Sequence, residues 1–463
     1  MSTPRVAVIG GGLTGLAAAW HLRDDAEVVV HEADRRAGGQ IRTIELADGP
    51  LDVGADAVLA RQPAGPALLA ALGFSDDELV HPATGRVQLW IDGRLRPLPE
   101  RTVFGVPTDL RALAASRVLS SADLAFAACE PARPRRQVAG DRSVADLVGE
   151  RFGQRVVTRL VEPLLGGVYA GAAERLSAQA TLPPVWAAAA THRSLLRGLS
   201  AHRARTAADD RPVFVTVRGG LGRVVARLAG ELGPRLRTGS TVRALAPHPG
   251  GVTLHLDDRT EVVDAVVLAV PAAVAAQLLA SGWRAVAREL AGIRAASVGV
   301  VALAYDRADA GAVPAGSGVL VPRDQGRLTK AITIGAAKWP HLAERERFVL
   351  RASVGRIDDH RALSLDDDRL IEQVDAEVRR CLGLRAPARE RVVVRWPHAL
   401  PQYDVGHHAR VDRIRHLLEQ APSGVHLAGA CLDGVGLAAR AADAVRVADE
   451  VRHRLRSGRQ VSV

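Results

Sequence analysis

The stretch Val6–Gly15, which reads Val-Ala-Val-Ile-Gly-Gly-Gly-Leu-Thr-Gly, runs a short apolar strand directly into spaced glycines, and an amphipathic segment over residues 16–22 follows it. In a dinucleotide-binding turn, Gly10 allows the tight bend, Gly12 lets the backbone approach a pyrophosphate, and Gly15 lets the helix pack close to the strand. The helix N-terminus then points its positive end at the phosphates. The stretch therefore predicts a strand-turn-helix unit that holds a dinucleotide.

An acidic residue completes this unit. A second apolar strand over residues 27–31 leads to Glu32, whose carboxylate can accept hydrogen bonds from a ribose. An ordinary strand-to-helix turn is the alternative interpretation of the glycines. The order of strand, glycines, helix, strand and acid is much more specific than the glycines alone, so it favours the dinucleotide site.

Two further glycine turns indicate a large flavoprotein rather than a simple nicotinamide dehydrogenase. Residues 35–42 read Arg-Arg-Ala-Gly-Gly-Gln-Ile-Arg, so the main chain can pass close to a ligand while Arg36 meets a phosphate or a ribose. A plain surface turn is the alternative for this motif taken alone. The bend at residues 51–56, Leu-Asp-Val-Gly-Ala-Asp, is expected beside the flavin.

Composition limits the class of protein. With 463 residues, 48% of them hydrophobic, the chain can bury a large core and is expected to form two or three domains. Three widely spaced cysteines and the absence of an apolar leader predict a cytoplasmic protein without a disulfide framework. The net charge of +10 comes from scattered arginines, and aromatic residues make up only 3%, so a nucleic-acid partner is not expected.

The longest uncharged stretch, residues 265–283, raises the question of a membrane span. Pro271 divides this stretch, which is better explained as a buried parallel strand over residues 265–270 followed by a helix over residues 272–279. Further strands are expected at residues 213–217, 241–245, 252–256 and 424–429, and a closing helix at residues 437–455.

The predicted fold is α/β with α+β insertions: a Rossmann-like FAD-binding domain, a mixed-sheet substrate domain and a helical insertion. Strands of the mixed sheet are expected in residues 297–305, 318–321, 348–354 and 391–396, with a helix over residues 366–382. The expected division is as follows: residues 1–56, 213–285 and 415–463 for the FAD-binding domain, 57–108 and 286–414 for the substrate-binding domain, and 109–212 for the helical subdomain.

Longer motifs resemble a known family over almost the whole chain. The glycine turns and the segment Ala428–Leu437 resemble the flavin-containing amine oxidase superfamily. Leu160–Gly171, with Glu174–Ser177 behind it, and Arg395–His407 resemble its protoporphyrinogen and coproporphyrinogen oxidase branch. The many arginines and few lysines resemble actinobacterial members, whose enzymes belong to a coproporphyrin-dependent heme route.

The motifs and the resemblance together imply a set of site residues. The expected FAD contacts are Gly10, Gly11, Gly12, Leu13, Thr14, Gly15, Glu32, Ala33, Arg36, Gly39, Gln40, Gly54, Ala55, Asp56, Ala57, Val242, Trp396, Gly429, Ala430, Val435, Gly436 and Leu437. The expected substrate contacts are Arg61, a cation for a propionate, and Val168 and Tyr169, which line the pocket over the macrocycle. Solvated or core roles for these three residues, and core packing for Trp396, are the alternatives. No catalytic base is identified, and Asp56 is expected to be structural.

A metal site is not expected, because His407 and His408 are adjacent and would diverge on a regular element. One departure from the family is visible. After the C-terminal glycines, where many relatives continue with a proline or a short polar turn and a cysteine, this chain has the alanine-rich residues 437–445.

The resemblance implies an FAD enzyme of heme biosynthesis that uses dioxygen to oxidise coproporphyrinogen III to coproporphyrin III, with hydrogen peroxide as the second product. Oxidation of protoporphyrinogen IX is the first alternative. Amine oxidase or carotenoid desaturase activity, and a carrier that binds tetrapyrrole without turning it over, are further alternatives. Peripheral contact with the inner face of the cell membrane, transfer of product to a chelatase and the oligomeric state stay open.

Overall fold

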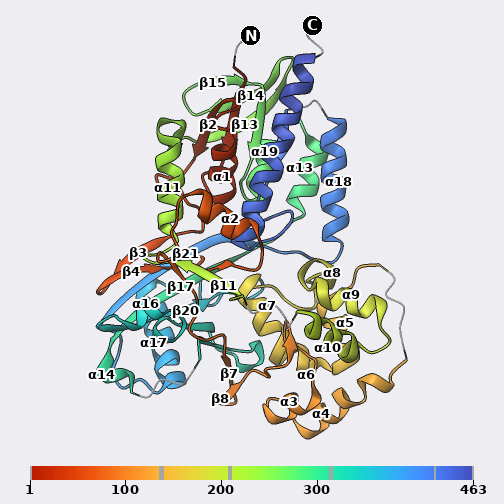
Figure 1. The fold of residues 1–463 in the computed structure, drawn as a ribbon, viewed down its shortest axis with the longest axis vertical. Coiled ribbons are helices and arrows are strands. Elements are labelled where there is room, and N and C mark those ends of the chain that lie inside the picture. Colours follow the sequence, from red (N-terminus) through yellow and green to blue (C-terminus); the bar gives the residue numbers. More distant parts are fainter. Residues whose placement is uncertain (1–2, 135–139, 207–210, 312–315, 422–423, 461–463) are drawn as a thin grey trace.

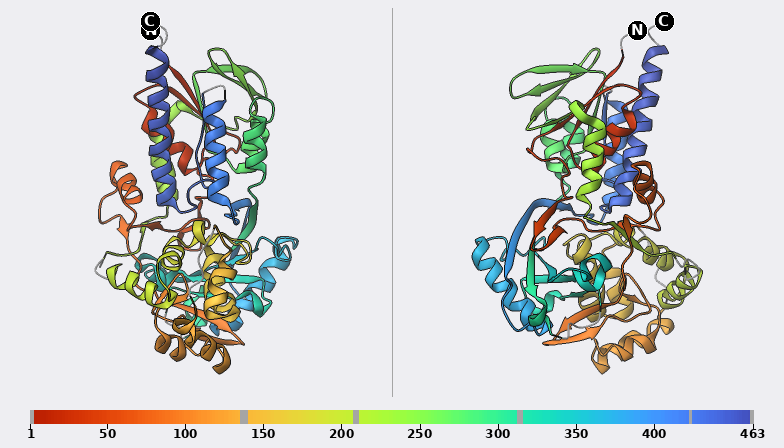
Figure 2. Two further views of the ribbon diagram at one scale, coloured as in Figure 1. Left: turned by 90° about the vertical axis from the view of Figure 1, so that its right-hand side faces the viewer. Right: turned by 60° about the vertical axis from the view of Figure 1, so that its left-hand side comes forward.

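The computed structural model describes residues 3–134, 140–206, 211–311, 316–421 and 424–460, which form two lobes (Figure 1). The first lobe is built on a five-stranded sheet, and the second on a seven-stranded sheet with a group of helices beside it. In both views of Figure 2 the upright helices of the first lobe lie above the second lobe and remain distinct from it.

The sheet of the first lobe is entirely parallel. Its strands, in spatial order, are β12 (Leu236–Thr238), β2 (Glu27–Glu32), β1 (Arg5–Ile9), β16 (Ala265–Leu268) and β22 (Val425–Leu427). The predicted strands near residues 265–270 and 424–429 are confirmed, and both lie on the same side of β1. All four residues of β16 are buried, as expected for a parallel strand with both faces covered.

Two apolar cores cover the two faces of this sheet. Side chains alternate along a strand, so Val6 and Val8 of β1 enter one core while Ala7 and Ile9 enter the other. The helices of the first core are α1 (Leu13–Leu22), α2 (Ala64–Ala71), α11 (Gly222–Leu232) and α19 (Leu437–Gln460). The elements of the second core are β13 (Val242–His248), β14 (Gly251–Leu256), β15 (Thr260–Val263), α12 (Ala272–Leu278), α13 (Arg284–Ala291) and α18 (His407–Gln420).

The apolar stretch around Pro271 therefore forms the strand β16 and the helix α12, as predicted. None of the helices in the described part of the chain is both long and apolar enough to cross a membrane.

The sheet of the second lobe is mixed. Its spatial order is β21 (Glu390–Pro401), β17 (Ala295–Asp306), β20 (Arg347–Val354), β19 (Thr329–Ile334), β18 (Gly318–Leu320), β7 (Val87–Ile91) and β8 (Arg94–Pro97). The helix α17 (Asp367–Leu382) covers one face and is capped by Asp366, whose side chain accepts from the backbone of Arg369. The predicted strands in β17, β18, β20 and β21 are confirmed. β19 was not predicted, because Lys330 and two threonines interrupt its apolar pattern.

The described part of residues 110–206 is mostly helical, as predicted, and its helices pack around their own core in the second lobe. The helices are α3 (Leu110–Ala115), α4 (Ser121–Ala128), α5 (Val144–Phe152), α6 (Gln154–Val156), α7 (Glu162–Val168), α8 (Ala178–Thr181), α9 (Pro183–Thr191) and α10 (Leu195–Thr206). The segment at residues 130–136, whose prolines and arginines predict a loop, lies partly outside the described residues.

The division into three domains stays a prediction, and the packing favours two changes to its boundaries. Val58 and the helix α2 (Ala64–Ala71) pack with α19 in the first lobe, although residues after 56 were expected in the substrate domain. The predicted boundary at residue 414 falls inside α18, which packs on α13. In addition, β11 (Phe214–Val217) pairs with β5 (Val58–Leu59) and β6 (Leu79–Val80) instead of joining the parallel sheet.

Candidate cofactor site

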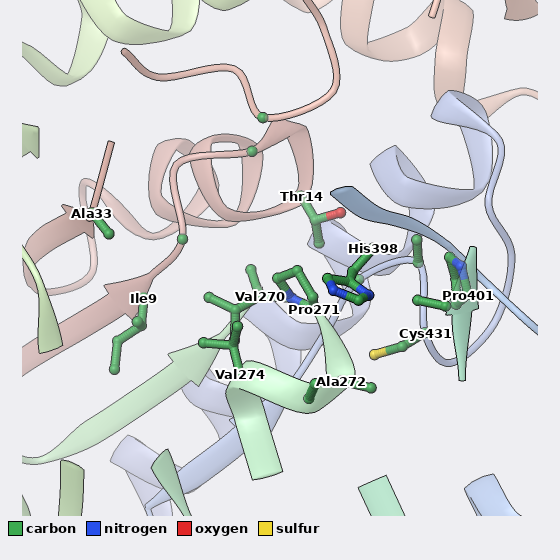
Figure 3. A pocket seen from close by; sticks show the side chains of 18 of the residues that line it. Ile9, Thr14, Ala33, Val270, Pro271, Ala272, Val274, His398, Pro401 and Cys431 are labelled. Atoms are coloured by element: carbon green, nitrogen blue, oxygen red, sulfur yellow. The ribbon is translucent and has the colours of Figure 1, made fainter. Parts of the chain in front are cut away.

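A cavity of about 570 Å³ lies where the parallel strands of the first lobe end. The residues that follow β1, β2, β16 and β22 all contribute to its wall, as the rule for ligands in open α/β sheets predicts. The tip of β21, from the second lobe, closes one side. Figure 3 shows Ala33 at one end and Pro401 and Cys431 toward the other, with Thr14 and His398 between them.

The glycine turn leaves room for phosphates. A Cβ on Gly15 would overlap the carbonyl oxygen of Gly10, so Gly15 sets the close packing of α1 on β1. A Cβ on Gly12 would have no atom within 4 Å, which means that the space before the first turn of α1 is open. Gly12 caps this helix without any side-chain hydrogen bond, so the first N–H groups of α1 are available to an anion.

Glu32 lies where the sequence predicted the ribose ligand. Its Oε2 accepts from the backbone N–H of Gly11 at 2.6 Å, and its Oε1 accepts from that of Asp34 at 2.8 Å. These bonds fix the carboxylate in the cavity wall, and each oxygen keeps a second lone pair for a ribose hydroxyl. Ala33 and Val242 also line the cavity.

Arg36 makes its hydrogen bonds within its own turn. Its guanidinium donates to the backbone carbonyls of Ala37, Ile41 and Gly39, at 2.9, 2.8 and 2.7 Å. The side chain therefore braces its own turn, and it is absent from the wall of the cavity. The motif identified the turn, but the carbonyls of that turn accept hydrogen bonds from the Arg36 guanidinium, which was expected to contact a phosphate or a ribose.

The bend expected beside the flavin is tightly packed. A Cβ on Gly54 would overlap the carbonyl oxygen of Gln40 and lie 3.2 Å from the ring of Trp396. The same carbonyl accepts from the N–H of Ala55 at 3.2 Å, and the indole N–H of Trp396 donates to the carbonyl of Val53 at 3.0 Å. Trp396 thus holds the bend in place from β21.

Asp56 is held between two cations. Its carboxylate lies 2.7 Å from Lys338 Nζ and 2.6 Å from Arg351 Nη2. Burial alone would raise the pKa of Asp56, but these two cations hold it well below its usual range. An ionised, doubly paired carboxylate is a poor proton acceptor, so the contacts favour the structural role over a catalytic one.

The C-terminal glycine segment is organised by one tyrosine. The hydroxyl of Tyr403 donates to the carbonyl of Ala430 at 2.6 Å and accepts from the N–H of Gly434 at 2.7 Å. Burial raises the pKa of this phenol, so it stays protonated and able to donate. The N–H of Gly429 donates to Asp443 of α19 at 2.6 Å. The loop between β22 and α19 is therefore fixed at both ends.

The three expected substrate residues do not come together as one cluster of contacts. The guanidinium of Arg61 donates to the carbonyl of Arg211 at 3.0 and 2.8 Å. Tyr169 is buried with its ring 5.4 Å from that of Tyr403, and burial raises its pKa to about 12. Val168, at the end of α7, is 46% exposed.

Of the predicted cofactor residues, the cavity wall contains Gly10, Gly12, Leu13, Thr14, Glu32, Ala33, Gly39, Gln40, Val242, Gly429 and Ala430. The others lie outside this wall: Gly11, Gly15, Arg36, Gly54, Ala55, Asp56, Ala57, Trp396, Val435, Gly436 and Leu437. Contacts with FAD from either group stay predictions.

His398 and Arg440 are among the residues of the wall that sequence reasoning missed. His398 has a positive φ of 48°, in the region that favours glycine, and this strain is invisible in the sequence. Arg440 left a signal, because it is the one charged residue in the alanine-rich start of the closing helix, residues 437–442.

Comparisons with known proteins agree with this site. The family model described as flavin containing amine oxidoreductase matches residues 13–451. A Mycobacterium tuberculosis protein named coproporphyrinogen III oxidase is 38% identical over 94% of this chain and 95% of its own length. The Bacillus subtilis protein of the same name is 30% identical over 93% of this chain and 94% of its own length.

Solved structures agree on the fold. A protein from Exiguobacterium sp. 255-15, provisionally named protoporphyrinogen oxidase, has a TM-score of 0.87 at 29% identity and covers 98% of this chain and 99% of its own. A reduced UDP-galactopyranose mutase shares the fold at 16% identity, with a TM-score of 0.72 over 97% of this chain and 95% of its own. The chain therefore belongs to the flavin containing amine oxidoreductase family, with FAD as its cofactor.

Proposed function

We propose that the chain oxidises coproporphyrinogen III to coproporphyrin III. The observation that carries this proposal is the full-length similarity to bacterial proteins named coproporphyrinogen III oxidase, at 38% identity in Mycobacterium tuberculosis. The reaction removes six electrons and six protons from the macrocycle, and three dioxygen molecules accept them as three hydrogen peroxide molecules. When bound, FAD supplies the hydride acceptor for each two-electron step.

The residues of this chain orient the reactants and exclude water from them. Trp396 and the paired Asp56 fix the bend at Gly54, and Tyr403 fixes the loop that follows β22. The end of α7 leaves open space, because a Cβ on Gly166 or Gly167 would have no atom within 4 Å, and Val168 is exposed beside it. This open space and the exposed apolar side chain support a tetrapyrrole substrate near Val168.

Protoporphyrinogen IX is the second candidate substrate. A Nicotiana tabacum protein named chloroplastic protoporphyrinogen oxidase is 29% identical over 96% of this chain and 84% of its own length. The two substrates differ in their number of propionates, so cations at the mouth of the site would distinguish them. Likeness to a putrescine oxidase at 18% identity and a TM-score of 0.68 concerns the fold alone. Product transfer to a chelatase and peripheral membrane contact remain further proposals.

The test compares the turnover of both porphyrinogens, prepared anaerobically and mixed with the FAD-loaded protein in air. We expect porphyrin fluorescence and hydrogen peroxide to rise together, faster with coproporphyrinogen III. The protein without FAD is the control for spontaneous oxidation. Failure with both substrates would reject the proposal, and stoichiometric porphyrin binding without flavin reduction would favour the carrier instead.

A further inference from the structure

Arg440 lies in the wall of the cofactor cavity, on the first turn of α19. Its neighbours along this turn are alanines, so the guanidinium enters a surface that is otherwise small and apolar. Burial lowers the pKa of Arg440, which means that its charge is held away from water at an energetic cost. Such a cost is usually offset by a nearby carboxylate.

No carboxylate of the described residues forms an ion pair with Arg440. Its side-chain partner is neutral: Nη2 donates to Oε1 of Gln40 at 2.9 Å. Nε is buried and has no hydrogen-bond partner among the described residues. A buried guanidinium with an idle N–H donor on the wall of a cavity points to an anionic ligand in that cavity.

The other charges in the wall are already balanced or acidic. Arg294 is paired with Asp404 at 3.1 Å, and Glu32 is an anion. Arg36, which the sequence suggested as the phosphate ligand, is occupied by its own turn. Arg440 is therefore the cation of this wall that a bound anion would neutralise.

The position of Arg440 indicates which part of FAD it would contact. Gln40, which holds Arg440, follows Gly39, and a Cβ on Gly39 would lie 3.2 Å from Cα of Gly12. The amide of Gln40 is fixed in turn by a bond to the carbonyl of Ala399. Arg440 is thus anchored beside the open space in front of α1, where the helix N-terminus favours phosphate.

We propose that Arg440 donates to the pyrophosphate of bound FAD and supplies, from the C-terminal helix, the cation that Arg36 does not supply from the glycine turn. The proposal rests on the FAD site, and it explains the alanine-rich departure at residues 437–445 as a surface shaped around one arginine. It requires no particular substrate.

The test uses apoprotein of the Arg440→Gln variant and measures the dissociation constants of FAD, ADP and adenosine. Loss of a charge-assisted hydrogen bond to phosphate should weaken the binding of FAD and of ADP alike, by about 10- to 100-fold, and leave the binding of adenosine unchanged. Arg456→Gln is the matched control, because this exposed arginine lies on the same helix far from the cavity and its loss removes the same charge. Equal loss for ADP and adenosine, or no loss for FAD, would overturn the proposal.

Melting of the apoprotein separates ligand binding from a structural role. Because the empty site leaves the buried cation uncompensated, Arg440→Gln apoprotein should melt at the same temperature as the wild type or higher. A fall in melting temperature beyond that of Arg456→Gln would show that Arg440 supports the fold, and would overturn the proposal. Binding is measured without turnover, so wild-type protein that binds FAD but oxidises no porphyrinogen would reject the proposed function alone.

Discussion

Lys330 is expected to destabilise the folded protein at neutral pH. It lies in the middle of the second sheet, on β19, and is only 5% exposed. Within the described residues its ammonium group has no ion pair, and the neighbouring charge named with it is another cation, Arg356. Burial, and secondarily Arg356, lowers the pKa of Lys330 from 10.5 to about 7.

The size of the effect follows from the two pKa values. In the unfolded chain Lys330 keeps its proton up to about pH 10.5, whereas the folded protein releases it near pH 7. The unfolded state therefore binds more protons between these values, and stability rises with pH through this window. The difference corresponds to roughly 5 kcal/mol as an upper bound, and relaxation around the charge reduces it to about 2–4 kcal/mol.

The Lys330→Met variant keeps the apolar stem and removes the charge. Urea unfolding of the FAD-loaded protein should show it about 2–4 kcal/mol more stable than the wild type near pH 6.5, with the gain vanishing near pH 10.5. Lys338→Met is the opposed control, because Lys338 pairs with Asp56 at 2.7 Å and its loss should destabilise the protein. The chain contains only these two lysines, so selective carbon-13 labelling gives two signals whose titration reports both pKa values. A Lys330→Met variant that is less stable at every pH would refute the reasoning.

Three other substitutions test the site. Gly12→Ala should leave the melting temperature of the apoprotein unchanged, because the new Cβ meets no atom. It should weaken the binding of FAD by about tenfold or more, because the methyl group fills the phosphate space, and a fluorescence titration measures this loss. Gly15→Ala should instead destabilise the apoprotein by about 1–3 kcal/mol, because its Cβ overlaps the oxygen of Gly10; an unchanged melting temperature would contradict the packing. Tyr403→Phe loses two hydrogen bonds to the loop after β22 and should cost about 1–3 kcal/mol in urea unfolding, with easier release of FAD; equal stability would show that water replaces the hydroxyl.

The elements that were predicted correctly have sequence signals that are either local or strongly apolar. The turn at Gly10–Gly15 requires glycines for steric reasons that hold in any fold, and the apolar run of β16 can only be a strand with both faces covered. β19 was missed because its buried lysine contradicts the rule that strands of a core are apolar. The same buried lysine that is expected to destabilise β19 therefore also prevented its prediction.

Contacts between residues that are far apart in the sequence account for features that were not predicted. Arg440 and Gln40 are 400 residues apart, and no periodicity relates one end of the chain to the other. The contacts of Arg36 were missed for a different reason, since the sequence does not show that three carbonyls of its own turn accept from it once the turn forms. Residues after 56 join the first lobe because α2 packs on α19, which the sequence also does not show.

A bulge in β21 explains how the second lobe reaches a cofactor held by the first. Opposite β17, the pairing passes from Trp396 to Leu400 while the partner strand advances by only two residues, so Pro397–Ala399 are displaced from the ladder. The N–H of His398 donates to Oγ of Ser297 at 2.9 Å, which holds the strained backbone of the bulge, and the carbonyl of Ala399 accepts from Gln40 of the first lobe. FAD in the cavity would contact walls from both lobes, because β21 contributes His398, Ala399 and Pro401 to a cavity that also contains the glycine turn. We therefore expect bound FAD to couple the unfolding of the two lobes, with the strained backbone of the bulge as part of that connection.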